Sequence, residues 1–198
     1  MAEAAAPLEL VLRDGAAVRA RELNPGDREY LAEGYRRLSP EARYHRFWTV
    51  TGEIGDRMLD RLLNQDPGNH EIWSVYDPSR NFSPLGAASW WRDARNPLEA
   101  EFSVTVLDSE QNRGIATLLL AILWLTAFRS GITTLVGNVM PENTGACAWM
   151  RHTGASGVWD GHMNTFRWQL DDLERLPQTR AATELAEWLA LLAPRLLE

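Results

Sequence analysis

The segment from Glu99 to Arg129 constrains the fold more than any other part of the chain. Phe102, Val104 and Val106 alternate with polar residues, which predicts a strand with one apolar face. The strand leads through an acidic turn to Gly114, where a solidly apolar helix is expected to begin. Such a turn places unpaired backbone N–H groups at the positive end of the helix dipole. The pattern indicates an anion site, and phosphate suits it best.

The small residues of this turn favour a diphosphate ligand. Gly114 allows close approach of the backbone, and Ala116 keeps the next position small. The turn lacks the Gly-Lys-Ser/Thr end of a P-loop and the three glycines of the dinucleotide fingerprint. A different diphosphate ligand is therefore expected.

The remaining patterns predict an α/β chain with a mixed, largely antiparallel sheet. Further strands are expected at Leu8 to Leu12, Ala17 to Leu23, Ile72 to Tyr76, Leu85 to Trp91, Thr133 to Met140 and around Thr165 to Leu170. Helices are expected at Arg28 to Arg37, after the cap Ser39, at Ile54 to Leu63, at Thr144 to His152, and at the C-terminal end, where Leu185, Trp188, Leu189, Leu192 and Leu196 share one side.

Composition excludes several classes of protein. A length of 198 residues predicts one domain, and a net charge of −7 argues against a nucleic-acid partner. All 20 cationic residues are arginine, so the chain has no lysine to be acylated. Cys147 is the single cysteine, which excludes an intrachain disulfide and a cysteine-based metal cluster. No metal is expected, and the reducing cytoplasm is the expected location.

No targeting segment or membrane span is predicted. The start MAEAAAPLEL has neither a basic region nor a long apolar region, and no apolar run reaches the roughly 18 residues that a span requires. This also favours a cytoplasmic location without a membrane partner.

Two motifs resemble landmarks of the GNAT acyltransferase superfamily. The run from Gln111 to Ala116 is similar to its Gln/Arg-x-x-Gly-x-Gly/Ala signature, and Val139 to Ala155 resembles its Asn-x-x-Ala helix and the segment after it. The resemblance covers about residues 16–170 and leaves 171–198 as a helical extension of the same domain. It implies a sheet of about six to seven strands, opened between Leu107 and Thr133 to admit coenzyme A.

The resemblance implies acetyl-CoA as the cofactor. Its pantetheine would bind the strand at Val104 and Val106, its diphosphate would rest on the amides of the turn, and Asn143 would steady the pantetheine arm. The implied cofactor-binding residues are Val104, Val106, Gln111, Asn112, Arg113, Gly114, Ile115, Ala116, Thr117 and Asn143.

The N-terminal part resembles bacterial Pat-type protein-lysine acetyltransferases in Arg13 to Gly15, Arg19 to Asp27 and Leu38 to Phe47. The resemblance implies an N-acetyltransferase with Glu101 as general base, which is needed because an amine with a pKa near 10.4 is mostly protonated at neutral pH. Partial burial is expected for Glu101. The alternative is a solvated strand glutamate with an arginine partner, and Glu99 competes for the catalytic role.

The chain departs from the family pattern at Met150, where many members carry a tyrosine general acid. Either the thiolate leaves unaided or another donor substitutes, for which Tyr76 and His152 are conceivable. His70 lies near the expected acceptor cleft, although a structural histidine fits equally well. Cys147 is expected to be buried and inert. One of Trp90 and Trp91 is expected in the core and the other along the cleft.

Three functions remain open. The first is transfer of an acetyl group to a lysine-bearing protein or another primary amine. The second is acetylation of a small-molecule amine. The third is a non-catalytic acyl-CoA-binding module, which Met150 favours and Glu101 disfavours. The C-terminal helix is expected to pack on its own domain, with a homodimer contact as the alternative.

Overall fold

A mixed eight-stranded sheet forms the centre of the protein. The computed structural model describes residues 6–64, 66–80 and 83–197. The strands lie in the order β1-β2-β3-β4-β5-β6-β8-β7, and β5–β6 is the parallel pair. In chain order they are β1 (Leu8–Val11), β2 (Ala17–Glu22), β3 (His70–Tyr76), β4 (Pro84–Arg92), β5 (Glu99–Val106), β6 (Thr134–Val139), β7 (Ser156–Trp159) and β8 (Asn164–Gln169).

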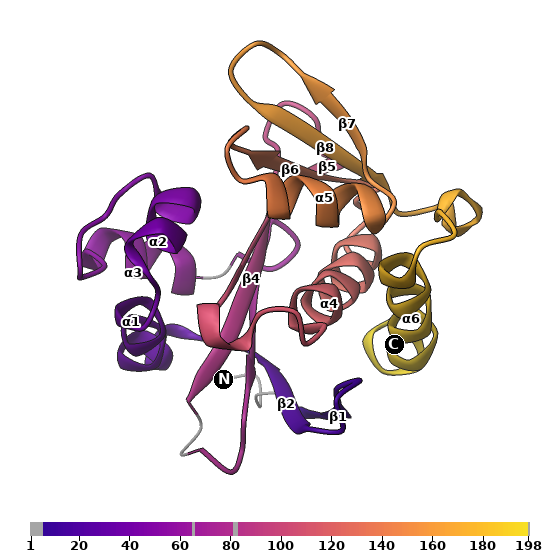
Figure 1. Ribbon diagram of the computed structural model, residues 1–198. Coiled ribbons are helices and arrows are strands. Elements are labelled where there is room, and N and C mark those ends of the chain that lie inside the picture. Colours follow the sequence, from indigo (N-terminus) through magenta and orange to yellow (C-terminus); the bar gives the residue numbers. More distant parts are fainter. Residues whose placement is uncertain (1–5, 65, 81–82, 198) are drawn as a thin grey trace.

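Helices cover both faces of this sheet. Figure 1 shows α1, α2 and α3 on one side of β4, with α4 and α6 on the other side and α5 against β6 and β8. Their bounds are α1 (Arg28–Arg36), α2 (Pro40–Phe47), α3 (Asp56–Leu63), α4 (Ile115–Arg129), α5 (Thr144–His152) and α6 (Arg180–Leu196). The expected cap of α2 is confirmed, because the Ser39 hydroxyl accepts a hydrogen bond from the Ala42 N–H at 3.1 Å.

The core is built around α4, which is buried along nearly its whole length. A helix that is apolar on all sides needs partners on all sides, and α4 packs against β3, β4 and β5 on one side and α6 on the other. All five residues predicted for the inner side of α6 are buried: Leu185, Trp188, Leu189, Leu192 and Leu196. The expected packing of this helix on its own chain is therefore confirmed.

The sheet opens between β5 and β6. Their parallel pairing spans only Glu99–Glu101, opposite Thr134–Val136. Beyond that point β5 stays paired with β4 as far as Val106, whereas β6 follows β8 as far as Val139. Residues 102–106 of β5 therefore have no strand partner on the β6 side.

The register shows which backbone groups face this opening. The Leu107 N–H donates to the Leu85 carbonyl at 2.9 Å, so the odd-numbered residues of β5 bond to β4. Because backbone groups alternate along a strand, the N–H and C=O groups of Val104 and Val106 point into the opening. These are the residues expected to bind pantetheine.

One strand was not predicted. The sheet has eight strands in the described residues, against the expected six to seven, because β7 pairs with β8 at the sheet edge. All four residues of β7 are exposed, so they lack the alternation of buried and exposed residues that identifies a strand in a sequence.

Trp90 and Trp91 lie on opposite faces of β4, and Trp91 is the register partner of Glu101 in β5. Trp90 is fully buried and donates a hydrogen bond to Thr126 of α4. Trp91 points to the other face of the sheet, where its ring stacks on His70 at 3.5 Å and Arg61 lies over it. The pairing of β3 with β4 places His70 directly opposite Trp91, which explains this contact.

His70 is a buried, uncharged histidine. Its residue is 1% exposed, and neither ring nitrogen has a hydrogen-bond partner among the described residues. Burial lowers the pKa of His70 to about 4. None of the helices in the described ranges is both long and apolar enough for a membrane span.

The His70 pKa predicts a pH dependence of stability. As the pH falls, the unfolded chain takes up a proton near pH 6.5, while the folded chain resists it until about pH 4. The free energy of unfolding should therefore fall across this window. His70→Phe, which keeps the stacked ring and removes the titration, should lose less stability than the wild type over this range in urea denaturation at several pH values. His162→Phe, a change at an exposed histidine, serves as the control. Equal losses in the free energy of unfolding of the wild type and both variants would refute the lowered pKa of His70.

Candidate active site

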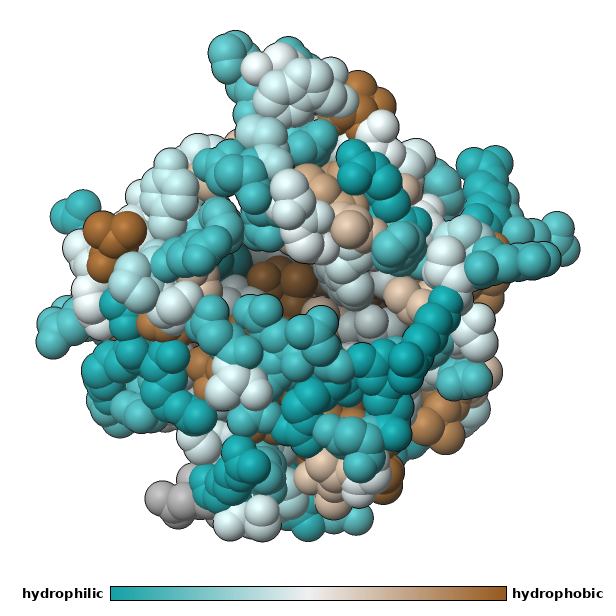
Figure 2. Space-filling view, in the orientation of Figure 1, coloured by the Kyte–Doolittle hydropathy of each residue, from teal (hydrophilic) through white to brown (hydrophobic). Residues whose placement is uncertain are grey.

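A cleft of about 1040 Å³ occupies the opening of the sheet. Figure 2 shows it as a central hollow with apolar surface inside and a hydrophilic rim. Residues of α2, β5, the turn before α4, α5 and the first turn of α6 line it. The cleft brings together Glu101 and all the expected cofactor-binding residues except Arg113, namely Val104, Val106, Gln111, Asn112, Gly114, Ile115, Ala116, Thr117 and Asn143.

The start of α4 presents free backbone amides to this cleft. Gly114 has φ of 88° and Asn112 has φ of 62°, which bends the chain sharply before the helix. No hydrogen bond within the described part of the chain involves the N–H groups of residues 112–117. Main-chain donors and the helix dipole therefore converge on one point, as an anion site requires.

Ion pairs hold this turn in shape. Arg13, on the turn between β1 and β2, donates a hydrogen bond to the Asn112 carbonyl. The Arg113 guanidinium pairs with Asp14 at 2.6 Å and also with Glu110. The hydrogen bond from Arg113 holds the pKa of Asp14 below its ordinary value. Because the Arg113 side chain makes these contacts, it is not among the residues that line the cleft.

Glu110 anchors the other side of the turn. Its carboxylate is buried and is also paired with Arg80 at 3.1 Å. A buried carboxylate with two arginine partners is costly to break, because removal of either partner leaves a buried charge unpaired. The first hairpin and the segment before β4 therefore brace the turn.

Glu101 and Glu99 have different surroundings. Glu99 forms an ion pair with Arg167 at 3.3 Å and does not line the cleft. Glu101 lines the cleft, and no ion pair or hydrogen bond within the described residues involves its carboxylate. The expectation that Glu101 is partly buried is wrong, since its residue is exposed at the point where β5 leaves β6.

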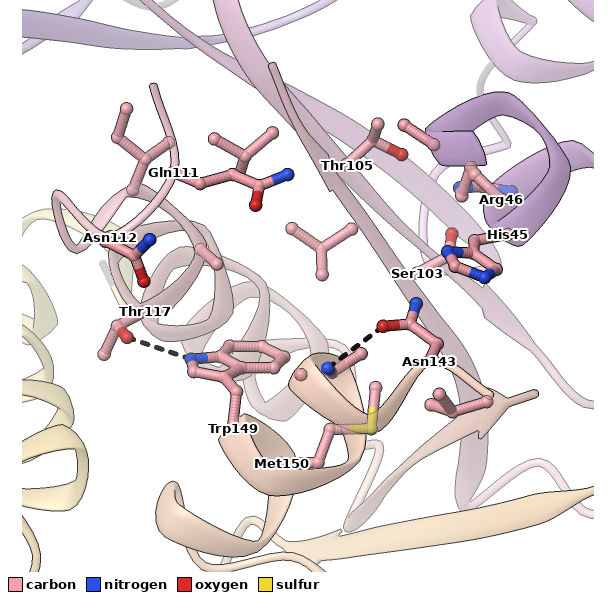
Figure 3. A pocket seen from close by; sticks show the side chains of 18 of the residues that line it. His45, Arg46, Ser103, Thr105, Gln111, Asn112, Thr117, Asn143, Trp149 and Met150 are labelled. Carbon is pink, nitrogen blue, oxygen red and sulfur yellow. Dashed lines mark hydrogen bonds between the residues drawn. The ribbon is translucent and has the colours of Figure 1, made fainter. Parts of the chain in front are cut away.

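Residues of α5 form the wall opposite β5. In Figure 3, Asn143 caps α5 by accepting a hydrogen bond from the Ala146 N–H at 3.1 Å. Its side-chain NH₂ group has no partner among the described residues. Trp149 of the same helix donates to the Thr117 hydroxyl at 3.2 Å and so ties α5 to the start of α4.

The structure identifies no tyrosine general acid in the described part of the cleft. Met150 is buried, lines the cleft and packs against Gly137. Tyr76 is buried outside the cleft, and His152 lines the cleft near Thr179, whose hydroxyl donates to the His152 carbonyl. Cys147 is buried, does not line the cleft, and has a thiol pKa raised by burial.

Several cleft residues were missed by the sequence reasoning. His45 and Arg46 of α2 lie beside Ser103 and Thr105 of β5 in Figure 3, and Arg13 and Glu184 approach the start of α4. The side-chain atoms of Arg13 and Glu184 pair at 3.1 Å. A methyl group added to Gly114 would overlap the Glu184 carboxylate. No local pattern in α6 signals this contact, because it depends on how α6 packs on α4.

Comparisons with known proteins show the GNAT fold. No protein-family model matches the chain. The chain is similar to the acetyltransferase Pat of Mycolicibacterium smegmatis, with 29% identity over 154 residues, which cover 77% of this chain and 45% of that protein. The GNAT domain of S. lividans PAT superposes with a TM-score of 0.77 at 22% identity, covering 82% of this chain and 96% of that domain. The structure of yncA from Salmonella typhimurium with its cofactor acetyl-CoA gives a TM-score of 0.62 at 19% identity, covering 78% of this chain and 95% of that one. The expected fold is confirmed.

The position of Glu184 yields a prediction for coenzyme binding. Its carboxylate lies at the N-terminal end of α4. It would repel a diphosphate bound there by about 1 kcal/mol or more at contact distance. Glu184→Gln should therefore bind coenzyme A about 3- to 10-fold more tightly in isothermal titration calorimetry at low salt. Glu187→Gln, an equal change of charge on an exposed part of α6 that does not line this cleft, should have a much smaller effect. Weaker binding by Glu184→Gln would contradict this placement of the diphosphate.

Proposed function

We propose that this chain, which has the fold of the GNAT acetyltransferases, is an acetyl-CoA-dependent N-acetyltransferase that acts on a primary amine. The observation that carries the proposal is the set of free backbone amides at residues 112–117, in one cleft with the open edge of β5 and with Glu101. The resemblance of the N-terminal segments, Arg13 to Gly15 and Leu38 to Phe47, to protein-lysine acetyltransferases supports a lysine side chain as the acceptor.

Different residues of the cleft bind different parts of coenzyme A. The amides of residues 112–117 hold the diphosphate at the start of α4. The backbone groups of Val104 and Val106 bind the pantetheine arm in the manner of an added strand, and the NH₂ group of Asn143 binds it from the opposite wall. Acetyl-CoA supplies an acetyl thioester at the end of this arm.

Glu101 and the backbone of β5 carry the chemistry. Glu101 accepts a proton from the acceptor ammonium, directly or through a water, and so leaves a neutral amine. The nitrogen forms a bond to the acetyl carbon and gives its second proton to solvent, and the carbon–sulfur bond breaks. A backbone N–H of β5 stabilises the charge on the carbonyl oxygen. Because Met150 cannot donate a proton, the thiolate takes its proton from solvent, which a thiol pKa near 8.5 permits.

The proposal is tested by acetyl-CoA binding and thiol release in parallel. Calorimetry measures binding, and release of free thiol is followed with a panel of lysine peptides and small amines. Because the chain contains no lysine, acetyl-lysine formed in the assay comes from the added acceptor. Transfer to lysine peptides supports the proposal. Transfer to small amines and not to lysine peptides would identify a small-molecule amine as the acceptor. Binding without thiol release from any amine would identify a non-catalytic module.

The role of Glu101 is tested by Glu101→Gln. Loss of a general base should lower kcat/KM about 10²- to 10⁴-fold near pH 7, with little change in acetyl-CoA affinity. The deficit should narrow as the pH approaches the acceptor pKa, because less deprotonation is then needed. Glu99→Gln is the matched control, since Glu99 lies on the same face of β5 but outside the cleft. Equal activity of the wild type and Glu101→Gln would remove Glu101 from the mechanism.

A further inference from the structure

Arg46 is a half-buried cation that makes no ion pair with a described residue. It projects from α2 to the cleft wall formed by β5, where Figure 3 shows it near Thr105. The side chain lies over the ring of Phe47, with 4.8 Å between the guanidinium carbon and the ring centroid. Among the arginines of the described ranges that make neither an ion pair nor a hydrogen bond, Arg46 alone is half-buried rather than exposed.

This arrangement is unfavourable unless a ligand completes it. Taking a guanidinium out of water costs free energy that a hydrogen-bonded anion normally offsets. Burial lowers the pKa of Arg46 to about 10, although the negative charge of Glu101 opposes this shift. The contact with Phe47 offsets only part of this cost. The planar fork of a guanidinium is well matched to a carboxylate or a phosphate.

Glu101 supplies the opposite charge in the same cleft without neutralising Arg46. Both side chains line the cleft, and the field of Glu101 acts on Arg46, yet no ion pair at or below 4.0 Å joins them. Two opposite charges that face one cavity and remain apart are complementary to a ligand that also carries both charges. When the ammonium group of such an acceptor binds at Glu101, the anionic group of the same acceptor faces Arg46.

The geometry points to an acceptor amine that carries an anionic group, a carboxylate or a phosphate, which is bound by Arg46. Arg46 is then a specificity-determining residue. The inference rests on the proposed acetyl transfer and adds the class of acceptor. For a lysine acceptor, the anionic group belongs either to the same amino acid, as its α-carboxylate, or to a neighbouring acidic residue.

Two pairs of acceptors separate these sources. The first pair is Nα-acetyl-lysine and Nα-acetyl-lysinamide, which share one reactive amine and differ in the carboxylate. The second pair is acetyl-Gly-Lys-Glu-amide and acetyl-Gly-Lys-Gln-amide. The wild type should prefer the anionic member of at least one pair by about 10- to 100-fold in kcat/KM, as expected for hydrogen bonds to a charged group. The pair that shows the preference identifies the source.

Variants of Arg46 test the residue itself. Arg46→Gln should abolish the preference, measured as the ratio of kcat/KM for the anionic and the neutral member of the pair. Arg46→Lys, which retains the charge without the fork, should restore part of the preference. Arg57→Gln makes the same change in net charge at an exposed position outside the cleft and should keep the full preference. The absence of a preference in the wild type, or its persistence in Arg46→Gln, would overturn the inference.

Acceptor binding in the presence of coenzyme A distinguishes this inference from the proposed transfer. If no acceptor caused the release of thiol, the proposed acetyl transfer would be refuted, whereas the role of Arg46 in acceptor binding would not. The anionic members should still bind more tightly than the neutral ones in calorimetry, and Arg46→Gln should remove the difference. Equal binding of both members by the wild type would overturn the role of Arg46, whether or not transfer occurs.

Discussion

The loss of pairing between β5 and β6 after Glu101 is the constraint on which the rest of the structure depends. A strand edge inside a sheet normally has a partner, because buried backbone groups without hydrogen bonds are costly. Here β5 keeps its pairing with β4 alone, and α4 begins a few residues later in the same opening. This one break in the pairing therefore exposes the backbone N–H and C=O groups of β5 beside the N-terminal end of α4.

Distant parts of the chain contact the edge of the opening. The hairpin turn at Arg13 and Asp14 holds the turn before α4 from one side, and buried Glu110 holds it from within. The helix α6 packs along α4 and places Glu184 at the position that favours negative charge. The N-terminal hairpin and the C-terminal helix thus both contact the start of α4, although neither belongs to the motif that predicts an anion site there.

The sequence was sufficient to predict most strands and helices and the residues around Gly114, because local alternation, caps and glycine positions determine them. It could not predict β7, whose exposed residues carry no pattern, or the turning of Arg113 toward Asp14. The separation of Glu99 from Glu101 depends on Arg167, which is brought close only when β8 pairs with β6. Arg46 was missed for a similar reason, since its exceptional feature is the absence of a partner in three dimensions. The roles of the site residues stay predictions.

The most direct measurement of the central claim is a titration of isotope-labelled protein with coenzyme A, followed by the NMR signal of each backbone amide. The N–H resonances of residues 112–117 should shift most, and pantetheine, which lacks the diphosphate, should leave them nearly unchanged. Coenzyme binding that shifts other amides and leaves these six in place would contradict the account.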